Sequence, residues 1–395
     1  MKIFIWGDGG SSTGFSTVNT EIIKGLPADA EVHHLAINYF GDPIDIETKC
    51  DYKMYPAAIR GQPLGLNRLQ EFANVGFDLI YLLNDIWVLD GVLETIKNTW
   101  KSIPPIVAYF PVDGGGYTDQ WFKHFDIVTI PVVYTEFGRR ICNEVVPDIE
   151  FEVIPHGTNF DNFYQMDKQK SKQTKYGNHP ELWDTFIVLN ANRNQPRKRL
   201  DIAFEGFSLF AEGKPENVHY YHHAGLRDAG WHIHTLIKRY NMQERIIISN
   251  KNQGFQNVSI EDLNLIYNAT DVGINTSLGE GFGLTNTEHA VTGAPQIVPD
   301  HSACTELFED CGLLIPTIMD HTYEQTMTIG RLVTPEGLAE QLNKIYYDKD
   351  LLENLGYKCR MKFTQYEYSW EYVSRQFYKL FERACQSHSQ QTQKT

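Results

Sequence analysis

The sequence from Ser277 to Pro295 reads SLGEGFGLTNTEHAVTGAP, and the rest of the chain can be understood from this stretch outward. It follows residues 271–275, DVGIN, a short apolar run typical of a strand buried in a parallel sheet. From residue 284 onward, apolar and small side chains recur at turn-like spacing, which predicts a helix. A strand, a glycine-rich turn and a helix in this order predict one unit of an α/β fold.

Two glycines and two glutamates indicate a ligand site at this turn. Gly281 and Gly283 fall where the strand passes into the helix, so a charged group can approach the backbone N–H groups at the positive helix end. Glu280 precedes the turn, and Glu288 follows about two helical turns later. Two acids beside an anion-binding helix start indicate a ligand with both phosphate and hydroxyl groups, which describes a nucleotide sugar.

The same stretch resembles the E-x7-E signature of retaining GT-B glycosyltransferases of family 4, the glycosyl transferases group 1. The matching residues are Glu280, Gly281, Phe282, Gly283, Leu284, Glu288 and 293–295. The resemblance implies an α/β GT-B fold, in which two doubly wound parallel-sheet (Rossmann-like) domains face each other across a cleft. It also implies that Glu280 holds sugar hydroxyls and Glu288 the ribose diol. Taken alone, the motif also fits a strand, turn and helix with two solvated acids.

A second cluster of chemistry-bearing residues follows the strand predicted at 186–190. The turn after it carries four cations in seven residues, among them Arg193 and Lys198. Such cations can bind a diphosphate, and the resemblance assigns Arg193 and Lys198 to the donor diphosphate. A solvated basic turn before a helix is the alternative. In the resembled family, the polar loop at 250–258 borders the nucleotide base.

The first half matches the family mainly in topology and in the positions of its glycines. A strand at 2–6 leads into a glycine loop, and the spacing of its glycines does not fit a dinucleotide site. Gly14 is the best match to the loop that lies near the donor phosphate in the resembled family. The alternative is that this loop is only a tight turn. Asp113 follows a strand at 106–110 where many relatives carry a histidine, so it either orients the sugar or an acceptor hydroxyl or caps a helix. His156 resembles a family segment at the exit from the first domain, and we expect it to be structural rather than to point into the cleft.

The order of predicted elements gives the domain boundaries. We expect an acceptor-side domain at 1–160 and a nucleotide-sugar domain at 180–362, joined by a polar, lysine-rich connection. A helix at 366–384 is expected to cross back onto the first domain, as the resemblance implies, and residues 385–395 are expected to form a disordered tail. Further strands are predicted at 32–37, 79–83, 127–131, 151–155, 218–223, 246–249, 272–275, 296–298 and 312–315.

Composition sets the remaining bounds. A chain of 395 residues favours two domains. The sequence contains no run of 18 apolar residues, so it predicts no membrane span. Six scattered cysteines and a start that resembles a first strand favour a cytoplasmic protein with reduced thiols. Residues 1–160 hold 11 Lys and Arg against 21 Asp and Glu, so they carry -10 of the net charge of -15. This acidity disfavours a nucleic-acid partner, but a local basic patch could still bind one.

These observations together predict a glycosyltransferase that moves a sugar from a UDP- or GDP-linked donor to a hydroxyl acceptor with retention, requiring neither metal nor cofactor. The single D-x-D, at 348–350, lies between two helices and away from any strand end, so we expect no metal site there. A transferase acting on DNA bases and a non-catalytic nucleotide-sugar-binding protein are the alternatives. The sugar, the base, the acceptor and the oligomeric state stay open.

Overall fold

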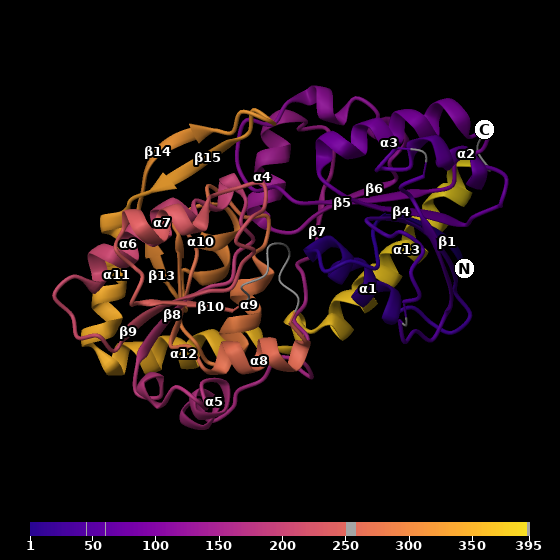
Figure 1. Ribbon diagram of the computed structural model, residues 1–395. Helices are drawn as coiled ribbons and strands as arrows, with labels where there is room; N and C mark the ends of the chain where they lie inside the picture. Colours follow the sequence, from indigo (N-terminus) through magenta and orange to yellow (C-terminus); the bar gives the residue numbers. More distant parts are fainter. Residues whose placement is uncertain (45, 60, 250–257, 393–395) are drawn as a thin grey trace. The chain divides into compact units, whose positions relative to one another are not determined.

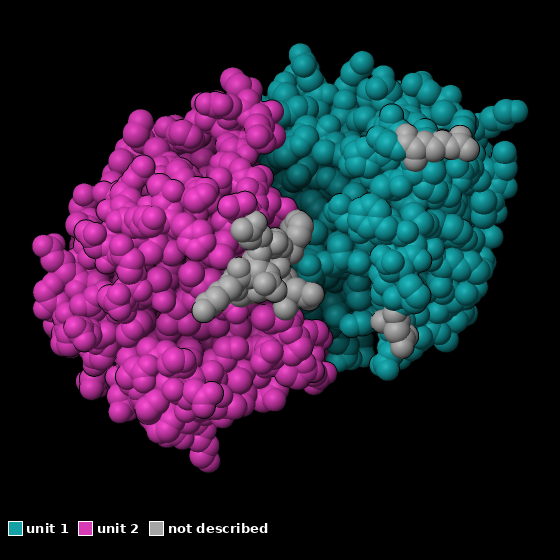
Figure 2. Space-filling model, viewed as in Figure 1, with its two compact units in different colours: residues 1–112, 117–157, 367–395 teal, residues 113–116, 158–366 magenta. Residues whose placement is uncertain are grey.

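The computed structural model describes residues 1–44, 46–59, 61–249 and 258–392 (Figure 1). The chain divides into two compact units (Figure 2). Unit 1 comprises Met1–Val112, Tyr117–Gly157 and Glu367–Thr395, and unit 2 comprises Asp113–Gly116 and Thr158–Tyr366. The four-residue segment 113–116 therefore belongs to unit 2, although the chain on both sides of it belongs to unit 1.

Unit 1 is a seven-stranded parallel sheet with helices on both faces. Its strands, in spatial order, are β3 (Asp51–Pro56), β2 (Glu31–Ile37), β1 (Lys2–Asp8), β4 (Leu79–Leu83), β5 (Ile106–Phe110), β6 (Ile130–Val133) and β7 (Glu152–Val153). Its helices are α1 (Gly14–Lys24), α2 (Leu69–Phe72), α3 (Ile86–Thr99), α4 (Glu136–Val145) and α13 (Trp370–Thr392), with 3-10 turns η1 (Leu66–Arg68), η2 (Asp119–Phe122) and η3 (Phe125–Ile127). The strand order changes direction between β1 and β4, as in doubly wound folds.

Strand alternation assigns the two faces of this sheet. Ile80 and Leu82 join the apolar cluster that also contains the buried face of α3, whereas Tyr81, between them, contacts the rings of Phe377 and Phe381 on α13. The helix α13 thus covers the face of the sheet that α3 leaves open. The sequence predicts a disordered tail from residue 385, but α13 continues to Thr392, because a polar helix already nucleated by its packed first turns extends at little cost.

Unit 2 contains a six-stranded parallel sheet and a separate antiparallel hairpin (Figure 1). The parallel strands, in spatial order, are β10 (Ile246–Ile248), β9 (Val218–His222), β8 (Phe186–Asn190), β11 (Val272–Ile274), β12 (Gln296–Pro299) and β13 (Leu313–Ile315). The hairpin pairs β14 (Thr317–Thr322) with β15 (Ile329–Val333). Here the order changes direction between β8 and β11, and these two strands lead into the two motifs that the sequence singles out.

The helices of unit 2 enclose a second apolar core. They are α5 (Lys168–Lys175), α6 (Leu200–Ala211), α7 (Ile233–Arg239), α8 (Ile260–Asn268), α9 (Leu284–Val291), α10 (Ser302–Phe308), α11 (Pro335–Tyr347) and α12 (Lys349–Phe363), with 3-10 turns η4 (Pro180–Leu182) and η5 (Pro196–Lys198). The turn η6 (Tyr366–Tyr368) lies where the chain passes from unit 2 back to unit 1. The apolar faces of α6 and α11 pack around Val188, Val272 and Ile297 of the sheet. The predicted α/β class with two doubly wound parallel sheets is therefore confirmed.

The lysine-rich segment that the sequence suggests as a connection contains α5, which is attached to unit 2 by a buried ion pair. Lys172 donates to Asp271 at 2.8 Å and to the Thr185 carbonyl at 2.6 Å, and its side chain is only 6% exposed. Asp271 also accepts the backbone N–H of Ile187 at 2.8 Å. Burial raises the pKa of Asp271, but Lys168 and Lys172 outweigh that effect and lower it, so the carboxylate stays ionised.

Removing this carboxylate should destabilise unit 2. Asp271→Ala leaves the Lys172 ammonium group buried without its counter-ion, and we expect the free energy of unfolding in urea to fall by about 3–5 kcal/mol. The matched control is Glu340→Ala, which removes an ion pair with Lys344 whose side chains are 65% and 47% exposed. That variant should lose less than about 1 kcal/mol. Equal losses in the two variants would contradict the structural role of the buried pair.

Candidate active site

The candidate site in unit 2 forms where its strand order changes direction. Strand β8 runs into the basic turn at 191–199, and the neighbouring β11 runs into the loop at 275–283 that precedes α9. Loops that leave adjacent strands toward opposite sides of a sheet open a crevice at their carboxyl ends, where open α/β sheets bind ligands. The two sequence motifs are thus brought together by the topology of the sheet.

A buried ion pair between Lys198 and Glu280 joins the two loops. Lys198 is the last residue of η5, and its Nζ donates to Oε1 of Glu280; the two side chains are 10% and 5% exposed. The same carboxylate oxygen accepts from Asn275 Nδ2 at 2.9 Å and from Ser277 Oγ at 3.0 Å. Glu280 is therefore held in one orientation by donors from both loops.

The surroundings of this pair keep Glu280 ionised. Burial raises the pKa of Glu280, but the nearby cations Lys198 and Arg197 and the hydrogen bonds outweigh burial and lower it to about 2. Burial lowers the pKa of Lys198, and the attraction of Glu280 opposes that shift. A carboxylate this acidic is a poor proton acceptor at neutral pH, so Glu280 is suited to accept hydrogen bonds or to hold a cation, and unsuited to general-base catalysis.

Arg197 is a site residue that the sequence analysis did not select. Its Nη1 donates to the Gly279 carbonyl at 3.0 Å and lies 3.6 Å from Oε2 of Glu280 and 3.8 Å from Oδ2 of Asp113. Four charged side chains, Lys198, Glu280, Arg197 and Asp113, thus form one cluster within unit 2. Burial raises the pKa of Asp113, while Arg197 opposes the shift. The available signal was its position next to Lys198 in a turn already predicted to bind a diphosphate.

Arg193 is paired with a carboxylate outside this cluster. Its guanidinium group donates to Asp228 from Nε at 2.7 Å and from Nη2 at 3.3 Å, and its side chain is 43% exposed. The turn explains the difference between the two arginines: residues 196–198 form a 3-10 turn and Arg199 takes a positive φ of 47°. This geometry directs Arg197 and Lys198 toward the β11 loop, which the spacing of residues alone does not reveal.

The glycine-rich turn leads directly into α9. Gly281 and Phe282 are buried, Gly283 is the residue before the helix with φ 95°, and Leu284 is its first residue. The first backbone N–H groups of any helix have no acceptor within it, so this end offers donors to an anion beside the charged cluster. A residue other than glycine would be strained at 283 because few side chains adopt this φ.

Glu288 lies further along α9 and has a different environment from Glu280. Its Oε2 accepts from the Tyr267 hydroxyl at 3.0 Å, and burial raises the pKa of Glu288 to about 7. The carboxyl group thus changes its charge within the physiological range. The loop predicted to border a nucleotide base, at 250–258, lies almost entirely outside the described residues.

The remaining two predicted residues lie in unit 1. Gly14 is exposed and begins α1, directly after Thr13, whose hydroxyl group donates to Asp8 at 2.6 Å and accepts the backbone N–H of Ser16 at 3.2 Å. His156 is buried beside the rings of Tyr109 and Tyr134, and burial lowers its pKa to about 3.

A hydrogen bond joins His156 to Tyr109 of β5. The Tyr109 hydroxyl donates to the Ile154 carbonyl at 2.7 Å, so it accepts from Nδ1 of His156 at 2.9 Å. A buried imidazole bonded in this way agrees with the expectation that His156 is structural, and its role stays a prediction. Through the Tyr109 hydroxyl it is linked to Ile154, the residue after β7.

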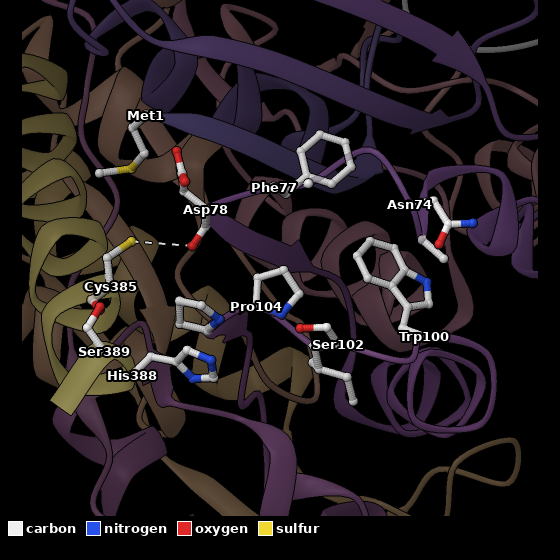
Figure 3. A pocket seen from close by; sticks show the side chains of 14 residues that line it. Met1, Asn74, Phe77, Asp78, Trp100, Ser102, Pro104, Cys385, His388 and Ser389 are labelled. Atoms are coloured by element: carbon white, nitrogen blue, oxygen red, sulfur yellow. Dashed lines mark hydrogen bonds between the residues drawn. The ribbon is translucent and has the colours of Figure 1, made fainter. Parts of the chain in front are cut away.

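A cavity of about 540 Å³ opens in unit 1 where several strands of its sheet begin (Figure 3). Three of its lining residues immediately precede strands: Met1 before β1, Asp78 before β4 and Pro105 before β5. Cys385 of α13 donates from its Sγ to the Asp78 carbonyl at 3.4 Å, which Figure 3 draws as a dashed line. Since open α/β sheets bind ligands at the carboxyl ends of their strands, this cavity does not belong to the site described above.

Two further observations concern metals and membranes. Within the described ranges, no group of three or more His, Cys, Asp and Glu side chains is arranged to hold a metal ion. Among the described helices, none combines the length and the apolar character needed to cross a bilayer.

Comparison with known proteins places this fold among glycosyltransferase structures. No protein-family model matches the sequence, and no curated protein matches it. Sucrose-phosphate synthase from Thermosynechococcus elongatus superposes with a TM-score of 0.75 at 18% identity, over 97% of this chain and 98% of that one. Anabaena HepE, solved with UDP-glucose, superposes with a TM-score of 0.72 at 16% identity, over 97% of this chain and 100% of that one. A glycosyltransferase from Rickettsia africae superposes with a TM-score of 0.67 at 15% identity, over 97% of this chain and 98% of that one. At these identities the likeness establishes the fold, and the chain has the GT-B fold of these glycosyltransferases.

Proposed function

We propose that this protein is a glycosyltransferase that moves a sugar from a nucleoside-diphosphate sugar, UDP- or GDP-linked, to a hydroxyl acceptor with retention of configuration. The observation that carries this proposal is the charged cluster at the start of α9, where Lys198 and Glu280 meet at the point at which the strand order changes. The structure of HepE with UDP-glucose, which shares the fold, supports a UDP-linked donor. No metal ion takes part in the proposed reaction.

The donor diphosphate would lie between the basic turn and the first N–H groups of α9. Lys198 supplies a point charge there, held in place by its contact with Glu280. Arg193 would turn from Asp228 toward the diphosphate, which exchanges its two hydrogen bonds with that carboxylate for bonds to the phosphate oxygens. Negative charge that develops on the departing diphosphate would then meet preorganised donors.

The protonation states of the cluster constrain the chemistry. Retention follows if the acceptor oxygen attacks the anomeric carbon from the face that the diphosphate leaves. Glu280, with a pKa of about 2, would hold the hydroxyl groups of the sugar and would not remove a proton. In that arrangement the oxygen of the departing diphosphate is the base nearest to the acceptor hydroxyl, and it would take the proton as the bond to the anomeric carbon breaks.

Replacing the cations tests the proposal directly. Arg193→Ala and Lys198→Ala should each lower donor turnover by ~10²–10³-fold, because each removes a donor to the leaving group. Turnover is measured with labelled UDP- and GDP-sugars as hydrolysis in the absence of acceptor, and melting temperature reports on folding. Arg239→Ala, an exposed cation on α7, is the control and should keep normal turnover. Near-normal turnover in both site variants would refute these roles, and tight donor binding by a wild type without turnover would identify a non-catalytic binding protein.

The second prediction concerns pH and Glu288. We expect nucleotide-sugar affinity to increase as pH rises from 6 to 8, because the pKa of Glu288 is about 7 and its ionised form accepts hydrogen bonds from the ribose diol more strongly. Calorimetric titration should use an intact nucleotide sugar, because a free diphosphate titrates near pH 6 itself. Glu288→Gln should bind more weakly and show no pH dependence in this range.

The pH dependence of folding stability checks the raised pKa of Glu288 independently, and it has the opposite sign to the pH dependence of affinity. Since the folded pKa of Glu288 lies above the unfolded value, the folded state binds the additional proton between about pH 4.5 and 7, and the wild type loses stability as pH rises through that window. The Glu288→Gln variant should lack this loss of stability.

For the affinity experiment, equal pH profiles in the wild type and in Glu288→Gln would contradict the assignment of Glu288 to the ribose.

A further inference from the structure

The hairpin β14–β15 contacts the Asp113 segment through its backbone. Ile329, the first residue of β15, donates its N–H to the Gly115 carbonyl at 2.8 Å and accepts the Gly115 N–H at 2.8 Å. Two opposite residues that exchange both N–H···O=C bonds form a hydrogen-bonded pair of an antiparallel ladder. The segment 113–116 is thus joined by one antiparallel bridge to the edge of β15 that faces away from β14.

The same edge of β15 also holds the loop of Glu280 and, through it, the basic turn. Backbone groups of residues two apart point to the same side of a strand, and Arg331 donates its N–H to the Leu278 carbonyl at 2.8 Å. Leu278 in turn donates to the Arg197 carbonyl at 2.8 Å. One strand edge therefore connects the three segments that carry Asp113, Glu280 and Arg197.

Glycines allow this close approach. A Cβ at Gly114 would lie 2.4 Å from the Ile329 carbonyl oxygen, and one at Gly279 would lie 1.7 Å from the Asp113 carbonyl oxygen. Gly116 has φ 74°, and a Cβ there would lie 2.9 Å from Cγ1 of Ile329. Gly114 and Gly116 are thus required by the hairpin, whereas a Cβ at Gly115 would lie at an ordinary 4.0 Å from the Ile329 carbonyl oxygen.

We propose that the hairpin β14–β15 positions Asp113 for the transfer reaction, with the backbone of Ile329 as the positioning group. The Asp113 carboxylate, 24% exposed and 3.8 Å from Arg197, then faces the charged cluster from a fixed place and can orient a hydroxyl group of the sugar or of the acceptor. This inference rests on the proposed glycosyltransferase function. It predicts that the contact between Ile329 and Gly115 affects turnover only through Asp113.

A proline at position 329 isolates the relevant hydrogen bond. Proline lacks the N–H that Gly115 accepts, and proline is tolerated at the first residue of a strand, which Ile329 is. The partner of Ile329 in the hairpin is Thr322; because Ile329 uses both of its backbone groups on Gly115, the β14–β15 ladder loses no hydrogen bond in this variant. Ile329→Val keeps the N–H and a β-branched side chain, and it is the matched control.

The experiment is a double-mutant cycle between Ile329→Pro and Asp113→Asn, with turnover and donor affinity measured separately. We expect Ile329→Pro to lower kcat by up to ~10²-fold while donor Kd changes less than about threefold, because a shift of about 1 Å at a positioned group has an effect of this size. Asp113→Asn should show a similar loss, and the double variant should be no slower than Asp113→Asn. Ile329→Val should keep wild-type kcat.

The possible outcomes separate the two proposals. Losses in kcat that multiply in the double variant, or a normal kcat for Ile329→Pro in a folded protein, would overturn the positioning role while leaving the transferase function intact. A wild type without turnover on any nucleotide sugar would overturn the function and, with it, this inference. If Ile329→Pro does not fold, Gly114→Ala, which forces the segment away from the hairpin, takes its place in the same cycle and carries the same expectation.

Discussion

The ion pair between Lys198 and Glu280 is the interaction on which the site depends. Desolvating two charges costs several kcal/mol for each ion, and a buried pair persists only when its geometry is good and its remaining hydrogen-bonding capacity is used. Here Asn275 and Ser277 supply further donors to the carboxylate from its own loop, and the bond to Lys198 holds that loop to the turn after β8. The N-terminus of α9 and the basic turn lie next to this pair, and the edge of β15 is bonded to the Glu280 loop at Leu278, which is why the proposed function places the donor diphosphate here.

Much of the fold could be predicted from the sequence, because strands buried on both faces are short apolar runs with clear ends. The runs at 79–83, 106–110 and 186–190 became strands with those same limits. The strands β3 and β14 were missed, because both are polar and partly exposed and carry no apolar signal. The strand expected at 127–131 begins only at Ile130, since the apolar residues before it form a 3-10 turn.

The candidate site was predictable to the extent that topology decides it. Lys198 and Glu280 follow adjacent strands, and the structure brings them into contact, although their roles in catalysis stay predictions. The local shape of the turn was not predictable, because Arg197, and not Arg193, points to the cluster through a 3-10 turn that spacing does not encode. Nor could the sequence indicate that Asp113 belongs to unit 2, since that depends on a hairpin with no recognisable strand pattern.

The central claim is that unit 2 captures a pyrophosphate between the basic turn and the start of α9. Hydrogen exchange of the full chain, followed by mass spectrometry with and without UDP-glucose or a GDP-sugar, tests it most directly. Binding should slow exchange in peptides that cover 191–199 and 277–291, because donors in these segments become engaged by the ligand. Protection that appears instead around the cavity at Met1 and Trp100, or binding without any protection of the two loops of unit 2, would contradict the account.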